Sequence, residues 1–145
     1  MEEYPGEWWT APTESIDNPA RTVFVTGRLD VEKFRDNPKY CNRLEVTFKY
    51  AESPAGMPDR ETAELLKSIT DNLVSTFNKN KVAILTGIYT GDGERNWVFY
   101  TKSLPLFGNY FNKALATLPL LPLEITAESD PAWVEYTQMS EILKY

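Results

Sequence analysis

Residues Val82–Ser103 form the stretch that most constrains how this chain can fold. Two apolar runs rich in β-branched and aromatic residues flank a short polar segment, Thr90–Arg95, which contains Gly91 and Gly93. Apolar runs of strand length around a Gly and Asp cluster are typical of a β-hairpin. Glycine adopts positive φ at little steric cost, so the chain can reverse direction within this segment. The stretch therefore predicts two antiparallel strands joined by a tight turn.

The segments on either side of the hairpin predict a further strand and helix each. Arg43–Ala51 and Pro122–Glu128 alternate apolar and polar residues, which is the pattern of a strand with one buried face. Between these strands, Asp59–Asn80 and Leu104–Leu118 carry apolar residues at helical spacing and indicate amphipathic helices. The predicted order from residue 43 to 128 is β-α-β-β-α-β. This order indicates a ferredoxin-like core, an antiparallel sheet with both helices on one face.

The same alternation predicts which side chains the two helices cover. In the hairpin, neighbouring residues of the second strand point to opposite faces of the sheet. In the outer strands, the inward set alternates with a polar set that faces away. The side chains expected beneath the helices are Leu44, Val46, Phe48, Leu123 and Ile125.

Both ends of the chain add smaller elements to this core. Glu7–Ala11 and Arg21–Leu29 indicate extra N-terminal strands that would extend the sheet. An Asp-Pro pair is a favourable helix opening, so Asp130–Met139 is predicted to be a short C-terminal helix. We expect its two large aromatic residues, Trp133 and Tyr136, to hold this helix against the body of the protein.

The composition limits both the architecture and the chemistry. A chain of 145 residues with 42% hydrophobic residues is long enough for a real core, and we expect one α+β domain over residues 1–145. The sequence has no histidine, which removes the usual Ser-His and Cys-His nucleophilic arrangements. It has one cysteine, Cys41, so zinc sites are not expected. An all-carboxylate site for a hard cation stays open, but the sequence has no calcium-loop spacing. We expect no cofactor or metal, and a non-enzymatic role is favoured.

The charge and the N-terminus limit the partners. The formal net charge of −6 is unfavourable for binding a phosphate backbone, so nucleic acid is not an expected partner. The acidic N-terminus, MEEYPGEWW, lacks the basic and apolar regions of a signal peptide, and no apolar run approaches the length of a membrane span. These features predict an acidic, cytoplasmic protein without membrane association, and they leave its oligomeric state open.

Arg95 and Tyr100 are the candidate ligand-binding residues. Arginine offers a planar fork suited to a carboxylate or phosphate, and tyrosine offers a hydroxyl that can assist. The spacing puts the two residues on opposite faces of an undistorted strand, whereas a bulge near Gly93 would bring them together. The alternative is that Arg95 stabilises the turn and Tyr100 packs inside the protein.

Glu124, Glu128, Trp133 and Tyr136 form the candidate interaction surface. The two glutamates share one face of the predicted last strand, in a C-terminal region where acidic residues outnumber basic ones. Such a face either keeps a protein soluble or binds a basic partner. The two aromatic residues either pack on the body or, on a free tail, serve as a recognition element.

Three short motifs carry a resemblance to a known family. They are Gly87-x-x-Thr90-x-x-Gly93-x-Arg95-x-x-x-Phe99-Tyr100, Asp130-Pro131-x-Trp133-x-x-Tyr136 and Gly56-Met57-Pro58. The chain resembles an uncharacterised bacterial family, domain of unknown function 695, from the early tryptophans to Tyr136. This resemblance implies an α+β domain of bacterial type and no catalytic residues. The acidity and the second motif also resemble the regulator of ribonuclease E activity B, an acidic inhibitor that acts by binding protein, although its long acidic tracts are absent here.

Taken together, these features favour a non-enzymatic cytoplasmic module that binds another protein, as a regulator would. The alternative is a small-molecule-binding protein or enzyme that uses Arg95, Tyr100 and nearby carboxylates. Binding of nucleic acid ranks third because the chain is acidic.

Overall fold

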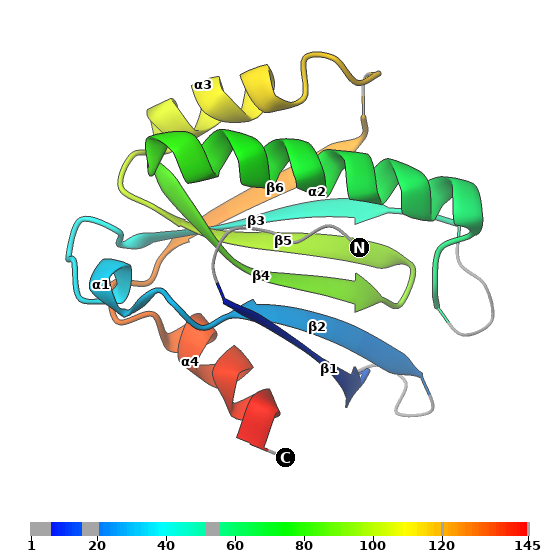
Figure 1. Ribbon diagram of the computed structural model, residues 1–145, viewed down its shortest axis with the longest axis horizontal. Coiled ribbons are helices and arrows are strands. Elements are labelled where there is room, and N and C mark those ends of the chain that lie inside the picture. The colour runs from blue at the N-terminus through cyan, green and yellow to red at the C-terminus, as the bar shows by residue number, and fades with distance from the viewer. Residues whose placement is uncertain (1–6, 16–20, 52–55, 120, 145) are drawn as a thin grey trace.

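Six antiparallel strands form one sheet with helices on both of its faces (Figure 1). The computed structural model describes residues 7–15, 21–51, 56–119 and 121–144. The strands in these residues follow the order β1-β2-β4-β5-β3-β6 across the sheet. Their bounds are β1 Trp8–Glu14, β2 Thr22–Arg28, β3 Asn42–Lys49, β4 Ala83–Gly91, β5 Glu94–Thr101 and β6 Leu123–Ser129.

The helices divide between the two faces of this sheet. α2 and α3 lie above the sheet in Figure 1 and cover its first face, and α4 lies below it on the second face. None of the helices in the described residues is long and apolar enough to cross a membrane. The bounds are α1 Glu32–Arg35, α2 Arg60–Asn80, α3 Leu104–Ala114 and α4 Val134–Ser140, followed by a 3-10 helix, η1, at Glu141–Lys144.

The central hairpin forms as the sequence predicts. Gly91 pairs with Glu94, so β4 and β5 are joined by a turn whose two central residues are Asp92 and Gly93. Their φ angles are 53° and 77°. Positive φ at both central positions matches the twist of the flanking strands, and an Asp-Gly pair is favoured there. Local turn chemistry therefore sets the register of the two middle strands.

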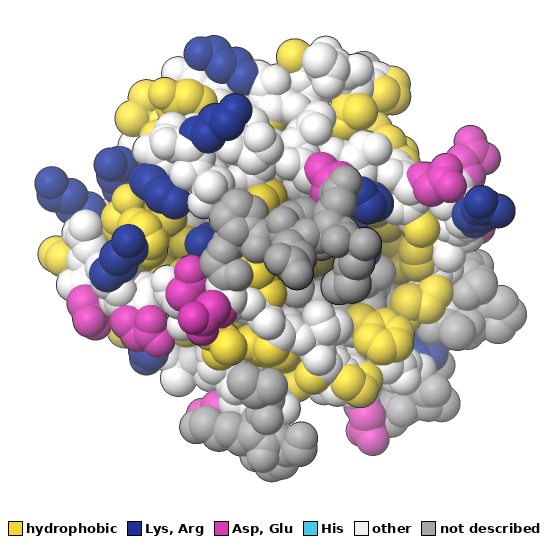
Figure 2. Space-filling model, in the orientation of Figure 1, with side chains coloured by type: hydrophobic (Ala, Val, Ile, Leu, Met, Phe, Trp, Pro, Cys, Tyr) yellow, Lys and Arg dark blue, Asp and Glu magenta, His cyan; other side chains and the backbone are white. Residues whose placement is uncertain are grey.

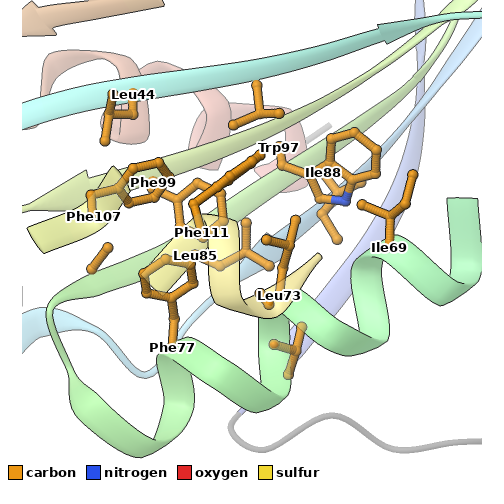
Figure 3. Packing of buried hydrophobic residues seen from close by; sticks show 14 of the residues in the cluster. Leu44, Ile69, Leu73, Phe77, Leu85, Ile88, Trp97, Phe99, Phe107 and Phe111 are labelled. Carbon is orange, nitrogen blue, oxygen red and sulfur yellow. The ribbon is translucent and has the colours of Figure 1, made fainter. Parts of the chain in front are cut away.

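The main hydrophobic core lies between the first face and the helices α2 and α3. Side chains from both helices meet the aromatic residues of β5, as Figure 3 shows. The ring of Phe77 in α2 stacks on Phe107 in α3 with centroids 5.0 Å apart, and Phe99 of β5 contacts both rings. As predicted, Leu44 and Val46 of β3 are buried in the same cluster.

Side-chain caps define where these two helices begin. Asp59 accepts a hydrogen bond from the Thr62 N–H at 2.7 Å, so α2 starts one residue after the predicted cap. Ser103 accepts one from the Leu106 N–H at 3.2 Å at the start of α3. α3 ends at Ala114, earlier than the predicted Leu118, and turns follow it.

The expected burial of Ile125 under the helices is wrong. Ile125 is 49% exposed, and the residues of β6 after Leu123 are all exposed. β6 is an edge strand that bonds only to β3 within the described sheet. Because α3 ends early, it does not extend over this edge. The alternation predicted the strand correctly, but it carried no information about which strand lies at the edge.

A second hydrophobic cluster covers part of the other face. Tyr100 of β5 stacks on Trp133 with ring centroids 4.2 Å apart, and both side chains are fully buried. Tyr136 packs edge-on against Trp133 and is 7% exposed. The indole Nε1 of Trp133 donates a hydrogen bond to the Tyr40 carbonyl at 2.8 Å. The C-terminal aromatic residues therefore hold α4 on the sheet face, as expected.

The C-terminal helix starts later than the Asp-Pro pair predicts. α4 begins at Val134, and Trp133 occupies the cap position with a φ of 54°. Asp130 and Pro131 instead lead into a turn closed by a hydrogen bond from the Trp133 N–H to the Asp130 carbonyl at 3.1 Å. This turn brings the Asp130 carboxylate within reach of the free N–H groups at the start of α4.

We predict that Phe99→Ala will destabilise the protein strongly. Phe99 is fully buried between two other rings, so its removal leaves a cavity, and the expected loss in free energy of unfolding is about 3–5 kcal/mol. Ile125→Ala is the matched control, since this residue of β6 is half exposed, and we expect less than about 1 kcal/mol. Urea unfolding measures both values. An equal loss in the two variants would contradict the assignment of the core.

Candidate functional site

The second face of the sheet carries an open groove beside α4. The groove has a volume of about 350 Å³. The end of β1, the central hairpin, β3, α4 and η1 contribute to its lining. The lining residues are Thr13, Glu14, Ser15, Val23, Arg43, Glu45, Tyr89, Gly91, Asp92, Glu94, Asn96, Glu135 and Ile142.

Carboxylates from five separate parts of the chain converge on this groove. Strand alternation places Glu45 of β3 and Glu94 of β5 on the second face, opposite the main core. The turn of the central hairpin adds Asp92, the end of β1 adds Glu14, and α4 adds Glu135. We call this set, Glu14, Glu45, Asp92, Glu94 and Glu135, the acidic groove.

Among the described residues that line the acidic groove, Arg43 is the one with a positive charge. Its side chain is only 10% exposed, and its guanidinium lies within ion-pair distance of three carboxylates. Nη1 lies 3.3 Å from Glu128 and 3.6 Å from Glu45, and Nη2 lies 3.5 Å from Glu135. Arg43 thus ties β3, β6 and α4 together. Its charge is shared among these acids, which leaves the groove with excess negative charge.

Hydrogen bonds hold two further acidic side chains, Glu94 and Asp92, in place. The Asn96 amide donates to the Glu94 carboxylate at 3.1 Å and to the Thr47 hydroxyl at 2.8 Å. Ser15 donates a hydrogen bond to Asp92, whose other oxygen lies 3.7 Å from Arg21. Such contacts limit the rotamers of these carboxylates, so the groove is partly ordered before any partner binds.

Tyr89 adds an aromatic wall to the groove. Burial raises the pKa of its hydroxyl, and the nearby Glu135 carboxylate raises it further, against an opposing effect of Arg43. The phenol therefore stays neutral throughout the physiological range and can donate or accept a hydrogen bond. Tyr89 also packs against the second hydrophobic cluster, so its ring lies on the face opposite α2 and α3.

Asp130 positions α4, and with it Glu135, beside the groove. Its carboxylate accepts hydrogen bonds from the Tyr100 hydroxyl at 2.7 Å, the Val134 N–H at 2.9 Å and the Glu135 N–H at 3.2 Å. Burial alone would raise the pKa of Asp130. These hydrogen bonds and the nearby charge of Arg43 outweigh burial, so the pKa is lowered below its usual value.

The structure does not bring Arg95 and Tyr100 together. β5 pairs with β3 without any shift in register, and the irregularity in the hairpin lies in β4, between Leu85 and Gly87. Arg95 therefore points to the first face. There its Nε donates to the Thr90 hydroxyl at 2.9 Å, and its Nη1 donates to the hydroxyl of Thr70 in α2 at 3.3 Å.

Tyr100 points to the second face, where it has no exposed surface. Its hydroxyl is the buried donor to the Asp130 carboxylate. Burial, followed by this hydrogen bond, raises the pKa of the Tyr100 hydroxyl well above the usual value. A shared ligand site for Arg95 and Tyr100 is not present in this arrangement. Ligand binding by either residue alone stays a prediction.

The predicted interaction residues fall into two groups. Glu124 and Glu128 are exposed on the second face of β6, with side chains 67% and 63% exposed. Glu128 shares Arg43 with the acidic groove, so the acidic surface continues to the sheet edge. Trp133 and Tyr136 instead pack inside the protein.

Sequence reasoning did not single out Arg43, Glu45 or Glu135 as parts of a site. The alternation of β3 indicated that Glu45 faces away from the core, which was the available signal. The sequence offered no signal that residues of β3 and α4 would meet, because these elements are far apart along the chain. Among the described residues, no group of three or more acidic, histidine or cysteine side chains is arranged to hold a metal ion.

Comparison with known proteins identifies the family of the chain. The model of a family described as "Family of unknown function (DUF695)" matches residues 7–139. The chain therefore belongs to this family, as its motifs indicated. No curated protein and no solved structure matches the chain.

We predict that Asp130→Asn will make stability less dependent on pH. The folded-state pKa of Asp130 is depressed, so its carboxylate stabilises the fold above the unfolded pKa, and this contribution is lost as the pH falls through the folded value. The variant should lose about 2 kcal/mol at pH 7, because hydrogen bonds to a charged group are replaced by weaker ones. Urea unfolding between neutral pH and about pH 3 measures the difference. If the difference in free energy of unfolding between the variant and wild type does not become smaller as the pH falls, this role of Asp130 is contradicted.

Proposed function

We propose that this member of the DUF695 family is a non-enzymatic module that binds another protein through the acidic groove. The observation that carries the proposal is the convergence of five carboxylates from separate elements on one open surface. A cytoplasmic, regulatory setting, expected from the sequence, is part of the proposal. The partner should present a basic segment, since complementary charge favours both encounter and register.

The distribution of basic residues supports this proposal. In Figure 2, Lys and Arg side chains gather at the left of the view, where α1 and the C-terminal end of α2 lie. The pKa of Lys81, just after α2, is lowered by burial and by the nearby positive charges of Arg28 and Lys33. None of these three cations lines the acidic groove, and Arg28 is already paired with Asp30 at 2.9 Å.

The shape of the acidic surface favours a protein segment over a small molecule. The surface runs from the hairpin turn at Asp92 across β5 and β3 to Glu128 on β6. A small ligand would be held by a few convergent groups in an enclosed pocket. Here the carboxylates are spread over several strands, which suits successive basic side chains of one polypeptide.

We also infer that the middle of the chain forms a ferredoxin-like core. The strand order β4-β5-β3-β6, with every neighbouring pair antiparallel, supports this inference. The positions of α2 and α3 on the first face support it as well (Figure 1). In this arrangement the two core helices leave the second face of the sheet uncovered. Here α4 covers part of that face, and the acidic groove lies beside α4.

We predict that Glu45→Gln combined with Glu94→Gln will weaken capture of the partner. The double variant removes two charges from the groove while keeping side-chain size, and we expect roughly a tenfold loss of affinity. The measurement is affinity capture from a lysate of the source cells, identification by mass spectrometry, and titration with the purified partner at several salt concentrations. Tighter binding at low salt is expected.

Glu61→Gln combined with Glu64→Gln is the matched control. These glutamates are exposed on α2, away from the second face, so the net charge changes equally but the groove does not. The control should bind as wild type does. Equal binding by both double variants, with unchanged melting temperatures, would contradict the proposed groove. Recovery of a co-purified small molecule that depends on Glu45 would favour the alternative function.

A further inference from the structure

We propose that the partner adds an extended segment to the free edge of β6, as a further strand of the sheet. The inference rests on the proposed protein-binding function and specifies how the partner is held. The segment alternates apolar side chains, which face the α3 side, with basic side chains, which face Glu124 and Glu128. Three features of the described residues carry this inference: an edge without proline, lysine or bulge, an apolar groove beside it, and complementary charge on the other face.

The edge at β6 lacks most of the usual protection against strand addition. β6 pairs with β3 over its whole length without a register shift, and it contains neither proline nor lysine. Edge strands are commonly protected by proline, by charged side chains and lysine above all, by bulges or by a covering element, and of these β6 carries only the charges of Glu124 and Glu128. The opposite edge, β1, has two of these features, because it contains Pro12 and contacts η1. The β1 edge is therefore better protected against strand addition than the β6 edge.

The hydrogen-bond phase of the ladder shows which backbone groups of β6 face outward. The Asp130 N–H donates to the Cys41 carbonyl at 2.8 Å, in the same register that pairs Ser129 with Asn42. Bonded and non-bonded pairs alternate along an antiparallel ladder. Counting back from Asp130, the N–H and C=O groups of Ile125 and Ala127 point away from β3. These groups are the ones that a new strand would bond.

An apolar groove of about 400 Å³ runs between the end of α3 and β6. Ile125 projects into it from the strand with half of its side chain exposed. A strand paired with β6 would point every second side chain toward this groove and bury it there. Its largest apolar side chains are those of Phe111, Leu115, Leu118, Leu121, Leu123 and Ile125.

The other face of β6 selects for positive charge. Glu124 lies 3.8 Å from Lys49, which is itself largely exposed, and Glu128 lies 3.3 Å from Arg43. Both glutamates keep most of their surface in solvent, so they can accept further ion pairs. Opposite charges on directly paired strands stabilise a sheet, whereas like charges destabilise it.

This charge pattern disfavours a second copy of the same chain as the added strand. Two β6 strands paired edge to edge would place four glutamates on one face of the joint, two from each copy. The chain also carries a net charge of −6, so copies repel each other. A basic segment of another protein meets the same edge with complementary charge.

The test uses short blocked peptides and the full chain. The probe alternates valine and lysine; one comparison peptide alternates valine and glutamate, and another has the probe's composition with the residues in two blocks. We expect the probe to bind at least about tenfold tighter than either comparison peptide in fluorescence anisotropy. It should also protect the Ile125 and Ala127 amides from hydrogen exchange, as measured by NMR.

Ala127→Pro tests the edge directly. It removes an outward N–H and leaves the bonds to β3 intact, so the variant should lose probe binding at an unchanged melting temperature. Ala127→Val keeps the N–H and is the matched control, which should bind normally. Should Ala127→Pro fail to fold, Glu124→Lys serves instead, and it should shift preference from the lysine peptide toward the glutamate peptide.

The outcomes separate this inference from the proposed function. The inference is overturned if folded Ala127→Pro binds the probe as wild type does, or if Glu124→Lys does not shift the preference. It is also overturned if sedimentation shows a dimer that Ala127→Pro abolishes. Partner capture that depends on Glu45 and Glu94 but survives Ala127→Pro would keep the acidic groove and remove the added strand. The reverse result would support the added strand and remove the groove.

Discussion

The hydrogen-bonded carboxylate of Asp130 is the interaction on which the second face of the protein depends. It joins the Tyr100 hydroxyl in the middle of the sheet to the first N–H groups of α4. The stacking of Tyr100 on Trp133 then closes the contact. A carboxylate can be buried here because its charge is shared among several donors, whereas an unpaired one would be very costly. α4, and with it one wall of the acidic groove, is placed by this single group.

Elements defined by local chemistry could be predicted from the sequence. The turn at Asp92 and Gly93 and the cap at Asp59 depend on a few adjacent residues, and both lie where the sequence indicates. The exposure of Ile125 depends on strand order and on where α3 ends, which are non-local properties. Period-2 alternation assigns a side chain to a face of the sheet, but it does not say whether that face is covered.

In the candidate site, too, the features that could be predicted are those that depend on residues close together in the sequence. Glu124 and Glu128 could be named because they share one strand, and the structure places both on the exposed second face. The contact of Arg43 with Glu135 could not be named, since α4 lies far from β3 along the chain, whereas Arg43 and Glu45 share one face of β3. For Arg95 and Tyr100, regular strand geometry already indicated opposite faces, and no bulge in β5 changes this.

β5 lies between two hydrophobic clusters, and this has a consequence for how the protein loses its structure. Residues Trp97 and Phe99 belong to the cluster under α2 and α3, and Val98 and Tyr100 belong to the cluster under α4. One short strand is thus a shared wall of two cores, buried on both sides. If the helices on either face detach, the apolar side chains of β5 on that face become exposed and the packing on the other face is weakened. We therefore expect the two hydrophobic clusters to unfold together as one cooperative unit. The edge strand β6 lies outside this unit, and we expect it to fray first.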